Sequence, residues 1–355
     1  MEAASVPART LGASPLVAAV RAFLERYGLI IVLVAGPLYY AVHDLAKDGS
    51  LVALGNTFVA GLSNGAIWAL VAVGYTLVYG IIELINFAHG DLFMIGSFVG
   101  FGMFGTVGLT LTTGTFGLIA GLLLTLVVCM LVCGSLNVMI ERVGYRPLRN
   151  APKLAPLITA VGFSFILQNV GELWLGGSQH GVPDLIRGGK EVFSIFGIEI
   201  AREDLLAIGV TAPLVYLMTT FIAHSRLGKA MRATAQDPEA ARLMGINVDT
   251  TISLTFLIGG LLAGAGGLIY ALYQTNIWFF QGFRAGLIAF TAAVMGGIGN
   301  LRGAVLGGLI IGFIQQLSDA RIGGEWTPVV VFAYLILIMT FRPQGLIGEE
   351  TREAG

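Results

Sequence analysis

Four polar side chains, Glu83, Asn86, His89 and Asp91, stand close together between two long apolar runs. An ionisable group at membrane depth costs about 3 kcal/mol even on lenient insertion scales, so such residues are candidates for function. Gly90 beside them permits backbone conformations that other residues resist. Two interpretations remain open. The segment is either a discontinuous helix whose polar groups line a substrate path, or a short cytoplasmic turn whose polar groups satisfy helix ends.

Under the first interpretation the candidate path residues are Asn86, His89, Gly90, Asp91, Thr291 and Asn300. Two further polar groups interrupt apolar runs, and for these we favour packing between helices over a role in passage: Gln168, Asn169 and Glu172, and Gln274, Asn276 and Gln281. His89 has no neighbouring histidine or cysteine cluster, so we expect no metal site. No catalytic residues are predicted.

The segment 224–250 carries signals for a short helix outside the membrane. Asp237 is placed to cap its N-terminus, Pro238 suits its first turn, and Gly245 is placed to end it. Ala241, Leu243 and Met244 would have no lipid to face. We therefore expect this short helix to insert into a cleft on a partner protein. The alternative interpretation is a helix that lies on the membrane surface.

The composition indicates which kind of secondary structure must hold these residues in place. Of 355 residues, 56% are apolar and only 12% are charged, with a mean hydropathy of +0.84, so the solvent must be lipid. The net charge of -1 excludes a nucleic-acid binder. We therefore predict an all-α polytopic membrane protein with roughly 8–10 transmembrane helices, including discontinuous or re-entrant segments. Expected apolar runs are 27–43, 57–80, 88–106, 115–140, 154–175, 204–223, 251–274, 285–299, 303–317 and 327–341.

Basic residues gather in alternate connections, which predicts that both termini lie in the cytoplasm. An N-terminal signal peptide is the alternative for the start of the chain, but no small-x-small cleavage site follows His43, so a retained first helix is favoured. The expected organisation is a cytoplasmic extension 1–26, a transmembrane domain 27–347, an extracytoplasmic loop 176–203 and a cytoplasmic tail 348–355. Glycine pairs at GxxxG spacing predict tight helix crossings. Cys129 and Cys133 are expected to be two buried thiols.

Several motifs in the right order resemble a known family. Glu239-Ala240-Ala241 with Gly245 resembles the cytoplasmic coupling loop of ABC importer permeases. More narrowly, the sequence resembles branched-chain amino acid (LivH-type) permeases in 74–80, 85–91, 232–241, 289–300 and 342–346. The Ile-x-Leu-Pro ending of the broader importer loop is absent and 246–249 replaces it, as expected for this subgroup. The extension 1–26 matches nothing in the family.

The resemblance implies one permease of an ABC importer in the bacterial cytoplasmic (inner) membrane, working by alternating access. Two ATPase subunits would bind ATP and Mg, a second permease (LivM-like or a copy of this chain) would complete the path, and a periplasmic or lipid-tethered binding protein would deliver substrate. The coupling-loop residues implied are Asp237, Pro238, Glu239, Ala240, Ala241 and Gly245. Branched-chain or related amino acids are the expected cargo, while urea, short amides and aromatic acids occur as cargo within the same group.

The residues support this division of labour independently. The sequence has no Gly-x-x-x-x-Gly-Lys-Ser/Thr phosphate loop, so we expect no cofactor in this chain and no enzyme activity of its own. A passive small-solute channel would explain the polar interruptions but not a capped cytoplasmic helix. A secondary transporter should carry more ionisable residues within its spans.

Overall fold

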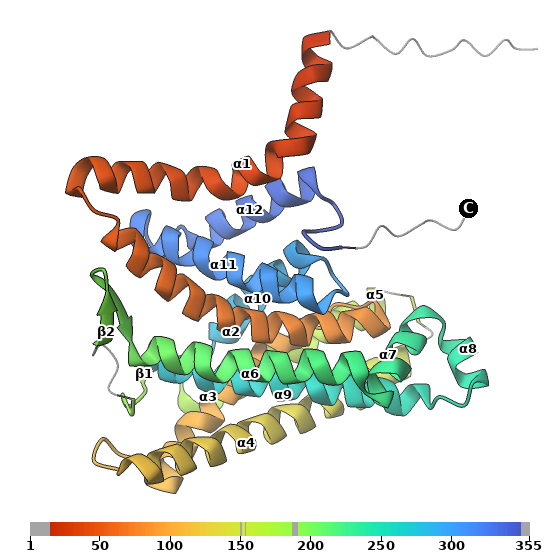
Figure 1. Cartoon of the computed structure of the whole chain (residues 1–355). Coiled ribbons are helices and arrows are strands. Elements are labelled where there is room, and N and C mark those ends of the chain that lie inside the picture. Colours follow the sequence, from red (N-terminus) through yellow and green to blue (C-terminus); the bar gives the residue numbers. More distant parts are fainter. Residues whose placement is uncertain (1–14, 150, 153, 187–190, 349–355) are drawn as a thin grey trace, which may run out of the picture.

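The computed structural model describes residues 15–149, 151–152, 154–186 and 191–348. Most of the expected extension 1–26 and nearly all of the expected tail 348–355 lie outside these ranges. The described residues form twelve α-helices with two short helical turns and four short strands (Figure 1). The elements in chain order are α1 (Pro15–Asp48), α2 (Val52–Ile82), α3 (Ala88–Val107), α4 (Thr115–Ile140), the π-helical turn η1 (Glu141–Tyr145), the 3-10 turn η2 (Arg146–Leu148), α5 (Leu154–Leu175), β1 (His180–Gly181), β2 (Glu191–Ile195), β3 (Ile198–Ala201), α6 (Arg202–His224), α7 (Arg226–Gln236), α8 (Pro238–Leu243), α9 (Val248–Gln274), β4 (Asn276–Ile277), α10 (Gln281–Gly296), α11 (Leu301–Arg321) and α12 (Thr327–Phe341).

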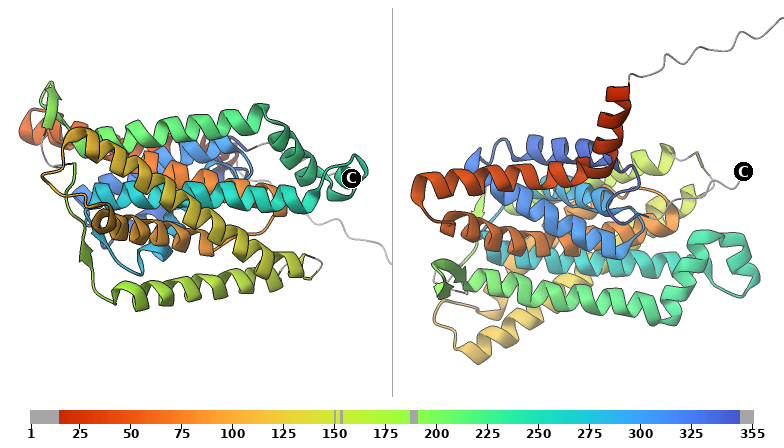
Figure 2. Two further views of the ribbon diagram at one scale, coloured as in Figure 1. Left: turned by 90° about the horizontal axis from the view of Figure 1, so that it is seen from below. Right: turned by 45° about the horizontal axis from the view of Figure 1, so that its top comes forward.

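Most of the helices run roughly along one common direction and form a bundle (Figures 1 and 2). Within the described residues, seven helices are long and apolar enough to cross a membrane, namely α2, α3, α4, α5, α6, α9 and α11. The shorter α12 is also apolar. These helices confirm the all-α polytopic fold class. The pair expected at 285–299 and 303–317 forms two separate helices, α10 and α11, which pack against each other.

The two ends of the bundle differ in structure. The helices α7 and α8 project from one end, here called the α8 end, beside the C-terminus of the described chain (Figures 1 and 2). The opposite end, here called the hairpin end, carries two antiparallel pairs of strands, β2 with β3 and β1 with β4. The hairpin β2–β3 lies in the connection expected at 176–203. The sequence did not predict any of these strands.

Close helix crossings depend on glycine, as the GxxxG spacing predicted. A Cβ atom at Gly312 would overlap the backbone of Gly65, and one at Gly308 would overlap Ala69, so these positions set the crossing of α11 on α2. Gly96 in turn meets Gly264 where α3 crosses α9. The pair at 117 and 121 is different, because these glycines meet residues of the connection that precedes α4.

The core lies where α2, α3, α9, α10 and α11 meet. Among the described residues its largest fully buried side chains are Trp68, Phe93, Phe98 and Phe256. Cys129 and Cys133 are buried and free, as expected. By contrast, many large apolar side chains of α4, α5 and α6 face outward, including Leu173, which is 87% exposed. Apolar side chains on the outer surface are what a protein needs when lipid is its solvent.

Candidate functional site

The segment after α6 folds as the sequence predicted. The Asp237 carboxylate accepts hydrogen bonds from the backbone N–H groups of Glu239 (2.8 Å) and Ala240 (2.9 Å), which caps α8. Pro238 occupies the first turn, and Gly245 ends the helix with a left-handed φ of +83°. The short helix α8 therefore has a defined start and stop of its own.

A preceding helix, α7, which the sequence analysis did not single out, holds this segment on the bundle. Ser225 caps α7 through the N–H of Gly228 (2.9 Å), and a Cβ atom at Gly228 would overlap the carbonyl of Ile222. The Arg232 guanidinium donates to that same Ile222 carbonyl at 2.8 Å and so satisfies the end of α6. α7 also packs on α2 and α9, so it joins α8 to three membrane helices, α2, α6 and α9.

The apolar residues of α8 divide into two groups. Ala241 is buried against the protein, so it does not offer the outward apolar contact expected of it. Leu243 and Met244 are 89% and 81% exposed at the tip of the segment. Large apolar side chains this exposed outside the membrane are typical of a surface that a partner covers. The predicted residues Asp237, Pro238, Glu239, Ala240 and Gly245 are exposed around them.

The segment 83–87 is a turn between two helices at the α8 end. α2 ends at Ile82, Glu83 adopts a left-handed conformation (φ 51°), and α3 begins at Ala88. The turn is tied inward by an amide chain. Asn86 Nδ2 donates to Asn137 Oδ1 (3.1 Å), and Asn137 Nδ2 donates to the Phe256 carbonyl (2.7 Å). The Asn86 side chain thus has a packing contact that joins the turn to α4 and α9.

His89, Gly90 and Asp91 are fully or nearly fully buried in the first turn of α3. The His89 ring stands edge-on against Tyr75, with centroids 4.5 Å apart. Asp91 accepts a 2.5 Å hydrogen bond from Ser164 of α5. Gly90 lies where α3 meets α10, because a Cβ atom there would overlap the backbone of that helix. All three residues therefore contribute to helix contacts.

The last two candidate path residues lie on α10 and at the start of α11. Thr291 is buried and its hydroxyl bonds the Leu287 carbonyl of its own helix (2.8 Å). Asn300 caps α11 through the N–H groups of Arg302 (3.0 Å) and Gly303 (3.1 Å). A role of these six residues in passage stays a prediction, and each has the local structural contact described above.

A small cavity of about 10 Å³ lies between α2, the 83–87 turn and α10. That is about enough room for a single water molecule. Tyr75, Tyr79, Asn86 and Phe290 are among the residues that line it. The space between α2 and α10 at the α8 end is therefore almost filled by side chains.

A much larger polar cavity of about 520 Å³ opens toward the hairpin end. It is bounded by α2, α9, α10, α11 and the start of α12, and it reaches inward to Trp68. Three charged residues line it, Arg284, Asp319 and Glu325, together with the amides Gln274, Gln281 and Gln315. Sequence reasoning missed the charged residues. Each stands beside an apolar run, where solvation at the membrane interface is the ordinary explanation of a charged residue.

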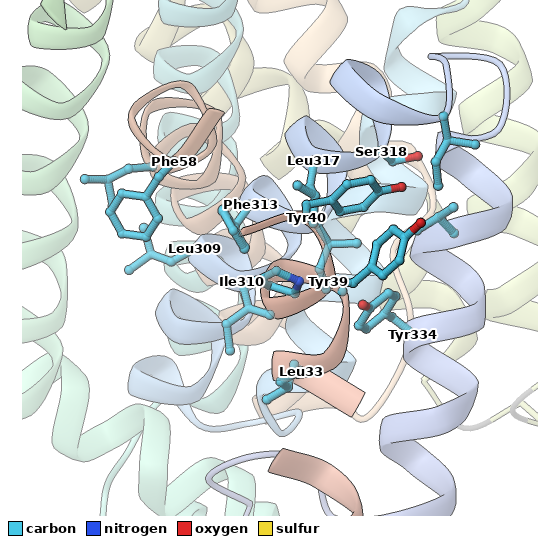
Figure 3. Close-up of a pocket in the computed structure, with 16 residues that line it drawn as sticks. Leu33, Tyr39, Tyr40, Phe58, Leu309, Ile310, Phe313, Leu317, Ser318 and Tyr334 are labelled. Atoms are coloured by element: carbon cyan, nitrogen blue, oxygen red, sulfur yellow. The ribbon is translucent and has the colours of Figure 1, made fainter. Parts of the chain in front are cut away.

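A third cavity, of about 600 Å³, is apolar. It lies between α1, α2, α11 and α12 and is lined by aliphatic and aromatic side chains such as Tyr39, Phe58, Phe313 and Tyr334 (Figure 3). None of the described residues that line it is charged. It lacks the groups that would bind a charged solute. No cluster of three or more potential metal ligands occurs in the described part of the chain.

An ion-pair network connects the α8 end to the 83–87 turn. Arg149 bonds both Asp249, in the first turn of α9, and the fully buried Glu141 (2.5 Å). Glu141 also accepts from Ser253 of α9 (2.6 Å). From the same η1 turn, the Tyr145 hydroxyl reaches a carbonyl of the 83–87 turn. The start of α9, immediately after the α8 segment, is therefore coupled to the small cavity.

Comparison with known proteins adds a second line of information. Residues 57–339 match the family described as branched-chain amino acid transport system / permease component. The chain is 41% identical over 295 residues to the high-affinity branched-chain amino acid transport system permease protein BraD of Pseudomonas aeruginosa. The aligned residues cover 82% of this chain and 94% of that relative. It is 41% identical over 291 residues to LivH of Escherichia coli, covering 81% and 93%. One solved structure, PsaBC from Streptococcus pneumoniae in complex with Fab, matches 85% of this chain and 95% of its own chain at 15% sequence identity. Its TM-score of 0.35 is too low to support an inference about this chain.

Proposed function

Since the chain belongs to the branched-chain amino acid transport permease family, we propose that it moves branched-chain amino acids across the bacterial cytoplasmic membrane by ATP-driven alternating access. Separate ATPase subunits hydrolyse ATP with Mg, and a binding protein delivers the amino acid. A second permease, related or identical to this chain, completes the translocation path. The α8 end faces the cytoplasm and the hairpin end faces the binding protein.

The observation that carries this proposal is the geometry of α8. Leu243 and Met244 stand exposed on a short, doubly capped helix, and α7 fixes that helix to α2, α6 and α9. Such a helix fits a groove on a partner. A closing movement of the ATPases would push on α8 and thereby shift helices that border the 10 Å³ cavity and the 520 Å³ cavity.

The arrangement of the 10 Å³ cavity and the 520 Å³ cavity supports a direction for the transport step. The large one, of about 520 Å³, lies at the hairpin end, and the small one, of about 10 Å³, lies at the α8 end. Trp68 of the first and Tyr75 of the second stand seven residues apart on α2, about 10 Å at helical rise. The rings of His89 and Phe290 pack against Tyr75. This is the form that would accept substrate from outside.

The test is ATP-dependent uptake of labelled leucine into vesicles that contain the complete transporter. Leu243→Asp is expected to lower both ATPase co-purification and uptake at least about tenfold, because it places a charge in the apolar contact. The matched control is Phe196→Asp, which alters a side chain that is 95% exposed in the hairpin. This control should retain ATPase co-purification.

A second variant, carrying both Glu239→Lys and Gly245→Asp, reverses a charge of α8 and strains its left-handed end. The double variant is expected to insert into the membrane and fold, but not to couple ATP hydrolysis to uptake. Size-exclusion chromatography in detergent reports folding. Normal uptake by this double variant would show that α8 is not the coupling element, and wild-type uptake without ATP would instead indicate a channel.

A further inference from the structure

We propose that the 520 Å³ cavity at the hairpin end binds a zwitterionic amino acid, with its carboxylate at Arg284 and Gln281 and its ammonium group at Asp319 and Glu325. The inference rests on the proposed function and assigns the substrate contacts within this chain. The cavity volume falls in the range of about 300–1,000 Å³ that small-molecule sites occupy.

The first support is the presence of both signs of charge in one cavity. Arg284 stands in the first turn of α10, Asp319 in the last turn of α11, and Glu325 in the connection to α12. Among the described residues no ion pair joins any of these three groups to another charge. Arg284 and Glu325 are exposed and Asp319 is half-buried, so all three can meet a solute that enters the cavity. A cation and two anions that line one cavity without pairing with each other match a ligand that carries both charges.

The second support is a buried donor without a partner. Gln281 is only 3% exposed, and its Oε1 accepts from the backbone N–H of Trp278 (3.2 Å). Its Nε2 has no hydrogen-bond partner in the described structure, and the residue lines the cavity. Gln281 and Arg284 stand three residues apart on α10, so both donors lie on the same helix face and can approach one carboxylate.

The opposite side of the cavity is prepared to receive an ammonium group. Asp319 accepts a hydrogen bond from the Thr327 hydroxyl at the start of α12, which orients its carboxylate. Ser318 lies 3.2 Å from that hydroxyl. The carboxylate is therefore held at the junction of α11 and α12, while Glu325 adds a second negative charge from the connection between these helices.

The inner wall is apolar and rigid. Trp68 donates its indole N–H to Gln315 (2.7 Å) and packs against Tyr270, with centroids 5.8 Å apart. Ile288 stands one turn below Arg284 on the same face of α10. A branched aliphatic side chain that points inward from a backbone held at Arg284 would meet this wall. Among the described residues that line the apolar cavity in Figure 3, none carries a charge that could hold such a backbone.

The test is protection of a thiol introduced by Gly324→Cys in the complete transporter. Gly324 lines the cavity, its backbone does not need glycine, and a Cβ atom would lie 3.5 Å from Asp319 Oδ1, an ordinary contact. The native Cys129 and Cys133 are buried and should not compete. Leucine should slow labelling by a methanethiosulfonate about tenfold. Leucinamide, which lacks the carboxylate, and isocaproate, which lacks the amino group, should not.

Two controls isolate the cavity. Gly114→Cys introduces a thiol in open space before α4, where leucine should have no effect on labelling. Arg284→Gln should abolish protection by leucine and lower uptake about tenfold, since it removes the carboxylate contact. Arg202→Gln, at the exposed start of α6, should preserve both.

The outcomes separate this inference from the proposed function. A wild-type transporter that takes up no leucine with ATP overturns the proposed function. If uptake is normal while leucine leaves the labelling at position 324 unchanged, the cavity assignment alone is wrong. Equal protection by leucine, leucinamide and isocaproate would likewise overturn the assignment of charges.

Discussion

The Tyr145 hydroxyl donates a hydrogen bond of 3.2 Å to the carbonyl oxygen of Ile85. This bond joins the η1 turn, which follows α4, to the turn between α2 and α3. The neighbouring η2 turn is held to the start of α9 through Arg146 and Asp249 (2.6 Å). The segment after α8 and the lining of the small cavity are therefore connected through one short piece of chain.

Tyr145→Phe is expected to weaken this connection without unfolding the protein. A single hydrogen bond contributes about 1 kcal/mol to stability, so the melting temperature should change little. The amount of leucine transported per ATP hydrolysed should fall, because α9 and the α2–α3 turn would move less closely together. The control is Tyr216→Phe on the exposed side of α6. An unchanged transport ratio in Tyr145→Phe would remove this bond from the coupling route.

Arg149→Gln is expected to lower the free energy of unfolding by about 3 kcal/mol, because it leaves Glu141 buried without its cation. Arg146→Gln is the matched control. The side chains of Arg146 and Asp249 are 45% and 41% exposed, so the loss of their ion pair should lower the free energy of unfolding by only about 0.5 kcal/mol. Thermal unfolding of both purified variants in detergent measures the difference. Equal costs would mean that Glu141 obtains enough stabilisation from Ser253 alone.

Asn137→Leu is expected to cost about 2–4 kcal/mol, because two buried partners, the Asn86 amide and the Phe256 carbonyl, lose their hydrogen bonds. Asn169→Leu provides the comparison. Asn169 is exposed on α5 and bonds only the Phe165 carbonyl of its own helix (2.8 Å), so about 0.5 kcal/mol or less is expected. Unfolding of each purified variant by urea or by heat measures both changes in the free energy of unfolding. A small cost at position 137 would argue against the amide chain.

Gly312→Ala is expected to destabilise the bundle by about 2 kcal/mol, because the added methyl group would overlap the backbone of Gly65 and separate α11 from α2. Gly162→Ala adds the same atom on α5 where no other group lies within 4 Å. That control should be neutral or slightly stabilising, since alanine favours helix over glycine. The melting temperatures of the two variants decide whether close approach, rather than helix propensity, explains the glycine at position 312.

Local patterns predicted the features that depend on neighbouring residues. The capped helix at 237–245 followed from an N-cap residue, a proline and a glycine at fixed spacing, and these signals act within one or two turns. The segment 83–91 was left between two interpretations because both place polar residues at a helix end. The structure has a turn at 83–87, where Asn86 contacts α4, while Asp91 at the start of α3 contacts α5. Sequence spacing could not show those contacts.

The sequence by itself determined that lipid is the solvent, that the chain is helical, and that a short capped helix stands outside the membrane. These conclusions depend on composition and on spacing along one helix, where the period of the α-helix relates position to direction. The polar cavity is different. Arg284, Asp319 and Glu325 stand far from Trp68 in the chain and share a cavity only because α2, α9, α10 and α11 cross closely at glycines. Only the tertiary structure could decide that arrangement, because interhelical packing brings together residues whose separation in sequence carries no information about their distance in space.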